Sequence, residues 1–169
     1  MEEYYFKMND NETYTIMGYR GDLKEIEIPS TYAGKPVTIL FDSLFKGHDE
    51  IIHVTIPKGI EDIGGFLFDG CNHLKKIDLP EGLKNIWQYA FVRTAIEEII
   101  LPDTLSTIPP FSFKDCKKLK TVVCGKGLKK IHGLAFQGCE SLQTVFSYPD
   151  IMIEENAFDH PVTIKTIQQ

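Results

Sequence analysis

The chain has 169 residues, 43% of them hydrophobic and 25% charged, a composition typical of a folded globular domain. Its longest unbroken apolar run is four residues, which is too short for a membrane-spanning helix. The formal charge is −6, and no run of Lys and Arg exceeds two residues. These values argue against nucleic acid and anionic membranes as partners, and we expect no membrane insertion.

The N-terminal region predicts a β-hairpin. Residues 4–7 and 13–18 have strand character and flank the turn-forming sequence Asn9-Asp10-Asn11. We expect this hairpin to cap the rest of the chain, which gives a cap over residues 1–22 and a repeat domain over residues 23–169. The chain opens with acidic residues where a signal peptide needs basic ones, so a native start at Met1 predicts a cytoplasmic protein.

An internal repeat dominates the remainder of the chain. Phenylalanine recurs every 22 or 23 residues, at Phe45, Phe68, Phe91, Phe113, Phe136 and Phe158. An aliphatic residue stands five positions before each of them, and in three repeats a cysteine stands three positions after. A unit of this length cannot bury its own apolar edge, so successive units must stack. The sequence therefore predicts a solenoid of about six coils, with the phenylalanines forming a continuous buried ladder.

Each coil also carries a strand pattern. In Leu74-Lys-Lys-Ile77-Asp-Leu79-Pro80 the apolar residues alternate, and proline ends the strand because it has no N–H to donate. A second, shorter inward segment follows, and the Ala-Phe-x-x-Cys stretch is expected to close the coil as a turn or a 3₁₀ piece. The first coil carries five extra residues, including Tyr32-Ala-Gly34-Lys-Pro36, which predict an additional turn.

The repeating unit, Ile-x-Leu-Pro followed by Ala-Phe-x-x-Cys-x-x-Leu, resembles the BspA-like leucine-rich repeat, the 23-residue class also described in treponemal proteins. The opening Tyr14-Thr-Ile-Met-Gly18 is similar to the first repeat of that family, and the resemblance extends over residues 14–167. It implies an α/β repeat solenoid, a right-handed coil with a parallel sheet on one face. It also implies a surface or secreted protein of host-associated organisms that acts in adhesion, with no enzyme activity and no cofactor.

Alternation along the strands predicts which residues face outward. The first outward ladder is polar throughout: Glu25, His53, Lys76, Glu98, Thr121, Thr144 and Thr166. The second changes from polar to apolar after its third member: Glu27, Thr55, Asp78, Ile100, Val123, Phe146 and Gln168. Stacked at strand spacing, its apolar members would form one exposed patch.

We interpret Ile100, Val123 and Phe146, with Tyr148 nearby, as a candidate partner-binding surface, because contiguous exposed apolar area tends to mark an interface. The pattern is also compatible with two simpler arrangements. Residues 149–169 could cover the patch, or β-propensity alone could favour Val and Ile on a solvated face. Trp87 is expected at an outer corner and is a candidate for a second contact.

The next outer-corner position predicts a second buried aromatic ladder, formed by Phe66, Tyr89 and Phe111. Four cysteines form no C-x-x-C pair, which predicts buried free thiols. Five histidines form no ligand-like pair, and we expect no metal site.

No nucleophile–base pair is visible, so we expect no catalytic residue. A cluster of carboxylates at Asp22, Glu25 and Glu27 is expected on an open, solvated face. The leading hypothesis is a protein-binding module that uses its sheet face. The alternative is a structural repeat protein that associates with itself.

Overall fold

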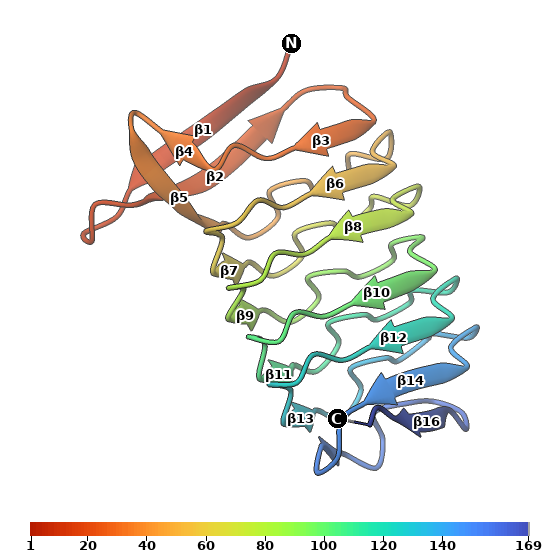
Figure 1. Cartoon of the computed structure of the whole chain (residues 1–169). Coiled ribbons are helices and arrows are strands. Elements are labelled where there is room, and N and C mark those ends of the chain that lie inside the picture. Colours follow the sequence, from red (N-terminus) through yellow and green to blue (C-terminus); the bar gives the residue numbers. More distant parts are fainter. Residues whose placement is uncertain (169) are drawn as a thin grey trace.

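The computed structural model describes residues 1–168 and shows a β-solenoid whose turns stack from the N-terminus to the C-terminus (Figure 1). Each turn contributes one short parallel strand to the same face, called the front face here. Within the described residues these front strands number seven, one more than the six coils expected. They are β3 (Glu25–Glu27), β6 (His53–Thr55), β8 (Lys76–Asp78), β10 (Glu98–Ile100), β12 (Thr121–Val123), β14 (Thr144–Ser147) and β16 (Thr163–Thr166).

A second series of strands, called the back ladder here, runs along the other side of the buried core. Its members also pair in parallel, and the aliphatic residue that ends each of the first five is buried because it faces the core. They are β5 (Lys35–Leu40), β7 (Asp62–Ile63), β9 (Asn85–Ile86), β11 (Thr107–Ile108), β13 (Lys130–Ile131) and β15 (Met152–Ile153).

The N-terminal hairpin predicted from the sequence is present. Strand β1 (Glu3–Met8) pairs antiparallel with β2 (Tyr14–Arg20), and β2 continues the back ladder by pairing in parallel with β5. The extra residues of the first coil form β4 (Thr31–Tyr32), which turns back antiparallel on β5. The ring of Tyr32 stacks on Phe6 with 3.9 Å between ring centroids, so the extra turn and the hairpin stabilise each other. Gln169, the last residue of the expected repeat domain, lies outside the described residues.

The phenylalanine ladder is confirmed. Successive rings from Phe45 to Phe158 stack with centroids 4.9 to 5.7 Å apart. The first five rings are fully buried, and Phe158 is partly buried against the core. Because every coil adds one ring, the core is a line of stacked layers and each coil packs on its two neighbours.

The expected α/β class and the 3₁₀ pieces are wrong, because residues 1–168 contain strands and turns but no helix of either kind. The Ala-Phe-x-x-Cys stretch is a turn, since residues on either side of the phenylalanine have left-handed backbone, which breaks a helical run. Two positions before the phenylalanine, φ is positive at Ser43, Phe66, Tyr89, Phe111 and Leu134. Two positions after it, φ is positive at Gly47, Gly70, Arg93, Asp115 and Gly138.

Strand pairing is interrupted once along the solenoid, between the coils that contain β8 and β10, although backbone hydrogen bonds such as Ala95 N–H to the Leu74 carbonyl, at 2.9 Å, still join them. The front strands divide there into sheets of three and four strands, and the back ladder divides between β9 and β11. On the back side the cause is Pro109. Trp87 and His132 occupy the same position in neighbouring coils, and each donates its N–H to the preceding coil at 3.0 Å, whereas proline has no N–H.

On the front side the interruption coincides with a shorter repeat. Phe91 and Ile96 are five positions apart, whereas Phe68 and Leu74 are six apart. Side chains bridge part of the gap. The Thr104 hydroxyl accepts a bond from the Gly82 N–H at 3.1 Å and donates to the Leu83 carbonyl at 2.7 Å.

The last front strand differs from the expected register. Thr163 and Lys165 of β16 pair with Thr144 and Phe146, in the positions expected for Thr166 and Gln168. The expectation was wrong because it assumed a full-length final coil, whereas the chain reaches β16 three residues earlier after Phe158.

Candidate functional site

The front face brings three of the predicted site residues together. Ile100, Val123 and Phe146 are register partners on β10, β12 and β14, and we call this set the front patch. The side chain of Ile100 is 64% exposed, while Val123 and Phe146 are half-buried. Parallel strands stand about 4.8 Å apart, so the three side chains form a continuous apolar strip.

A gap in the sheet bounds the front patch on one side and a cation bounds it on the other. Beside Ile100, a groove of about 530 Å³ opens between β8 and β10, where the strands do not pair. Its lining includes Asp78 and Glu98. At the opposite end, the Nζ atom of Lys165 lies 5.5 Å from the centroid of the Phe146 ring. The patch is thus apolar in the middle and charged at both ends.

Apart from Lys165, whose Nζ atom lies over the Phe146 ring, residues 149–168 do not cover the front patch, which argues against the first of the two simpler arrangements. Their strand β16 pairs with the edge of β14 and extends the sheet sideways, so the outward side chains stay on the surface. Tyr148 follows the end of β14 and is half-buried. Ile164 is the register partner of the buried Val145 but is 41% exposed.

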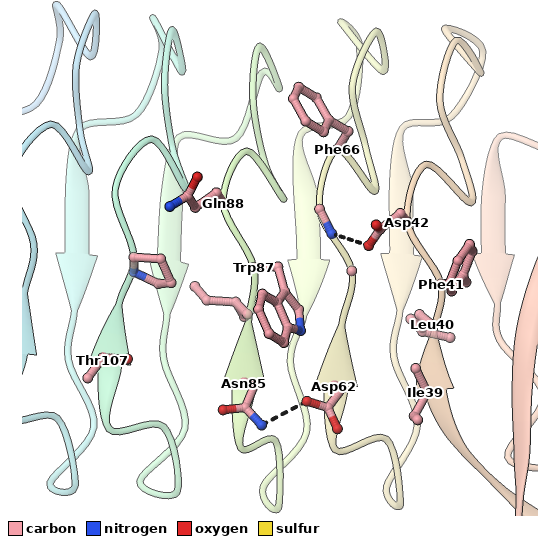
Figure 2. A pocket seen from close by; sticks show the side chains of 14 residues that line it. Ile39, Leu40, Phe41, Asp42, Asp62, Phe66, Asn85, Trp87, Gln88 and Thr107 are labelled. Carbon is pink, nitrogen blue, oxygen red and sulfur yellow. Dashed lines mark hydrogen bonds between the residues drawn. The ribbon is translucent and has the colours of Figure 1, made fainter. Parts of the chain in front are cut away.

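Trp87 does not join the front patch. It follows β9 in the back ladder, is 58% exposed and lines a separate surface groove of about 930 Å³, which we call the back groove (Figure 2). Phe41 and Phe66, 45% and 40% exposed, line the same groove. Its polar lining includes the side chains of Asp42, Asp62, Asn85, Gln88 and Thr107.

Of these groove residues, only Trp87 was among the site residues expected from the sequence. Counting from the repeat would have placed Phe41 and Gly64 in one row with Trp87, because each follows the buried aliphatic residue of its coil. The pattern that indicates a groove is a glycine, Gly64, between two aromatic residues at the same position of successive coils.

The second aromatic ladder forms, but the prediction that it is buried is wrong. Phe66, Tyr89 and Phe111 stack with centroids 4.6 and 5.0 Å apart, while Phe66 is exposed and the other two are half-buried. All three have positive φ and mark the outer corner where the chain reverses. The rings therefore stack along the outside of the corner.

The thiols are free and buried, as predicted. Burial raises the pKa of both the Cys71 and the Cys124 thiol to about 12, so neither forms a reactive thiolate at neutral pH. Among residues 1–168 no cluster of three or more His, Cys, Asp or Glu side chains has an arrangement that could hold a metal ion.

Comparison with known protein families identifies the repeat type. A family model described as the BspA type leucine rich repeat region matches six copies over residues 38–165, about three quarters of the chain. The chain belongs to this family. The resemblance noted from the repeat motif is thereby confirmed.

Solved structures of leucine-rich repeat proteins share the fold. A T. pallidum leucine-rich repeat protein is 30% identical with a TM-score of 0.81, and the match covers 85% of this chain and 68% of that one. A leucine rich cell surface protein from Faecalibacterium prausnitzii A2-165 is 23% identical with a TM-score of 0.68, covering 96% and 53%. The pneumococcal vaccine antigen PcpA is 21% identical with a TM-score of 0.77, covering 88% and 37%.

This chain therefore spans between about a third and two thirds of the length of these structural relatives. A comparison with curated proteins gives no significant match. In the part of the chain that the structure describes, no helix has the length and apolar character needed to cross a membrane.

Proposed function

We propose that this BspA-type repeat chain is a non-enzymatic protein-interaction module that binds its partner with the front patch. The observation that carries the proposal is Ile100, a large aliphatic side chain held 64% exposed on a regular strand. Contiguous exposed apolar surface with a polar rim is typical of interaction sites. Here Asp78 and Glu98 near one end and Lys165 at the other supply that rim.

A role in adhesion at the cell surface is supported by the family and by the structural neighbour described as a cell surface protein. A solenoid fits this role because its stacked strands present a rigid face whose shape does not depend on a flexible loop. A rigid patch loses little conformational entropy when it binds.

The test compares two substitutions that add the same charge on neighbouring outward ladders. Ile100→Asp places a carboxylate in the front patch, while Thr121→Asp places one on the polar ladder and serves as the matched control. The wild-type chain and both variants would be titrated by biolayer interferometry against a panel of purified extracellular-matrix proteins. We expect at least one protein to bind wild type and T121D equally, and I100D at least tenfold more weakly, or about 1.4 kcal/mol. If I100D binds as tightly as wild type, the front patch is not the binding site.

Self-association is the second candidate function, and Ile164 favours it. This side chain has the inward register of its strand yet is 41% exposed, and β16 pairs only with β14 among the described residues. An open edge strand can pair with a second copy. Sedimentation equilibrium from 1 to 200 μM would detect an oligomer that Ile164→Asp dissolves. A concentration-independent monomer would reject this function.

A further inference from the structure

The back groove contains a slot formed by the repeat itself. Phe41, Gly64 and Trp87 occupy the same position in three successive coils, so two aromatic side chains flank a position with no side chain. The backbones of Phe41 and Trp87 are two strand spacings apart, about 9–10 Å. The Gly64 backbone lies close against the preceding coil, since a Cβ atom there would be 2.5 Å from the Asp42 nitrogen. The slot therefore has a backbone floor and aromatic walls.

Two carboxylates border this slot, and each has an oxygen free to accept. One oxygen of Asp42 accepts from the Gly65 N–H at 2.8 Å, and one oxygen of Asp62 accepts from the Asn85 amide at 2.7 Å, both drawn as dashed lines in Figure 2. Among residues 1–168 the second oxygen of each carboxylate has no hydrogen-bond or ion-pair partner. The residues lining the groove include these two acids and no Lys, Arg or His. The groove is thus apolar, aromatic and negatively charged.

Neighbouring aromatic rings already bind cations of this chain. The Nζ atom of Lys46 lies 5.9 Å from the Phe66 ring centroid, and that of Lys114 lies 5.7 Å from the Phe111 ring centroid. Over residues 1–168, no equivalent cation lies over Trp87, although indole is the aromatic ring that attracts cations most strongly. The exposed indole of Trp87 lines the groove with two acids, and it could accept a cation from another molecule in the same way.

We propose that the back groove binds an arginine side chain presented by a peptide segment of a partner protein. The guanidinium stacks on Trp87 and donates hydrogen bonds to the free oxygens of Asp62 and Asp42, while its methylene stem packs in the Gly64 slot. Arginine fits better than lysine because the guanidinium is planar, is weakly hydrated and can donate two parallel bonds. This site is separate from the front patch and does not depend on the function proposed for it.

Trp87 makes the proposal directly testable because it is the only tryptophan of the chain. Its fluorescence would be followed while the peptide acetyl-Gly-Arg-Gly-amide is titrated into the full chain. We expect a saturable change that weakens as NaCl rises, because ion pairing at a partly exposed site is screened by salt. The same peptide with citrulline, a neutral isostere of arginine, should bind at least fivefold more weakly.

Variants of the chain separate the groove from a general charge effect. Asp62→Asn should weaken binding of the arginine peptide about fivefold. Asp103→Asn removes one exposed carboxylate outside the groove and should leave the affinity unchanged. Equal binding of the citrulline peptide, or unchanged affinity in D62N, would overturn the proposal. Saturable binding of cellohexaose without binding of the arginine peptide would also overturn it and assign the groove to a neutral saccharide.

Discussion

The thiol of Cys71 lies 3.1 Å from the carbonyl oxygen of Phe45, on the preceding coil. The same contact recurs twice along the solenoid, from Cys116 to Phe91 and from Cys139 to Phe113, at 3.0 Å each. In each case a buried S–H donor points at a main-chain carbonyl inside the core. A small, weakly polar side chain suits this position, since it fills the space beside the phenylalanine ladder and gives a second donor to a carbonyl that already accepts a backbone N–H.

The thiols should therefore react only when the chain unfolds. All four cysteines are buried, and the raised pKa of Cys71 and Cys124 leaves them protonated at neutral pH. We expect Ellman's reagent to label fewer than one thiol per native chain at pH 8 and all four in 6 M guanidinium chloride. Rapid labelling of the native protein would contradict the burial of this core.

The phenylalanine ladder should dominate stability. Phe113→Ala removes a fully buried ring that stacks on rings above and below it, and the cavity should cost about 3–5 kcal/mol. Phe113→Leu is the control, since it keeps most of the volume and should cost less. Urea unfolding followed by circular dichroism gives both values. A midpoint for the Ala variant equal to that of wild type would refute the ladder as the core.

The interruption between β8 and β10 should be visible in amide hydrogen exchange. The N–H groups of Leu101 and Thr121 bond to the next or preceding coil at 2.8 and 3.3 Å. Those of Leu79 and Glu98, at the equivalent positions facing the interruption, make no such bond within residues 1–168. We expect Leu79 and Glu98 to exchange at least tenfold faster in heteronuclear NMR spectra. Uniform protection across all four amides would show that the sheet is continuous.

Asp78 should make stability depend on acid pH. Partial burial favours its neutral form, but hydrogen bonds from His53, at 2.6 Å, and from Lys76 outweigh this and lower the pKa of Asp78 below its usual value. A carboxylate with a lowered pKa stabilises the fold above its unfolded pKa, near 4, and that stability is lost as pH falls through the folded pKa.

The size of this effect is limited because the Asp78 side chain is nearly half exposed, and solvent screening holds it to about 0.5 kcal/mol or less. Urea unfolding of wild type and Asp78→Asn between pH 2.5 and 6 measures it. The variant should lose stability less steeply with acid, and parallel pH profiles for the two chains would count against the interaction.

Much of the fold could be predicted from the chain because it depends on residues repeated in every coil. The spacing of the phenylalanines indicates stacking, and the Leu-x-x-Ile-x-Ile-Pro pattern indicates where each front strand lies. Ile100, Val123 and Phe146 could be placed in one row for the same reason, since strand alternation and a constant period determine their register. The left-handed residues beside each phenylalanine carry a weaker signal, since glycine stands two positions after it in only three of five coils and none stands two positions before it, so the turns were not told from 3₁₀ pieces.

The sequence by itself determined the coil, its buried ladder and the row of outward residues, because the same apolar positions recur and can be buried only by stacking. Only the tertiary structure showed how neighbouring coils that differ in length or sequence pack and pair with each other. The missing N–H of Pro109 divides the back ladder, strand pairing on the front face stops at the shorter repeat after Phe91, and the early start of β16 brings Lys165 beside Phe146. The repeat places Phe41, Gly64 and Trp87 in one row, but only the folded coils show that this row lines an open groove.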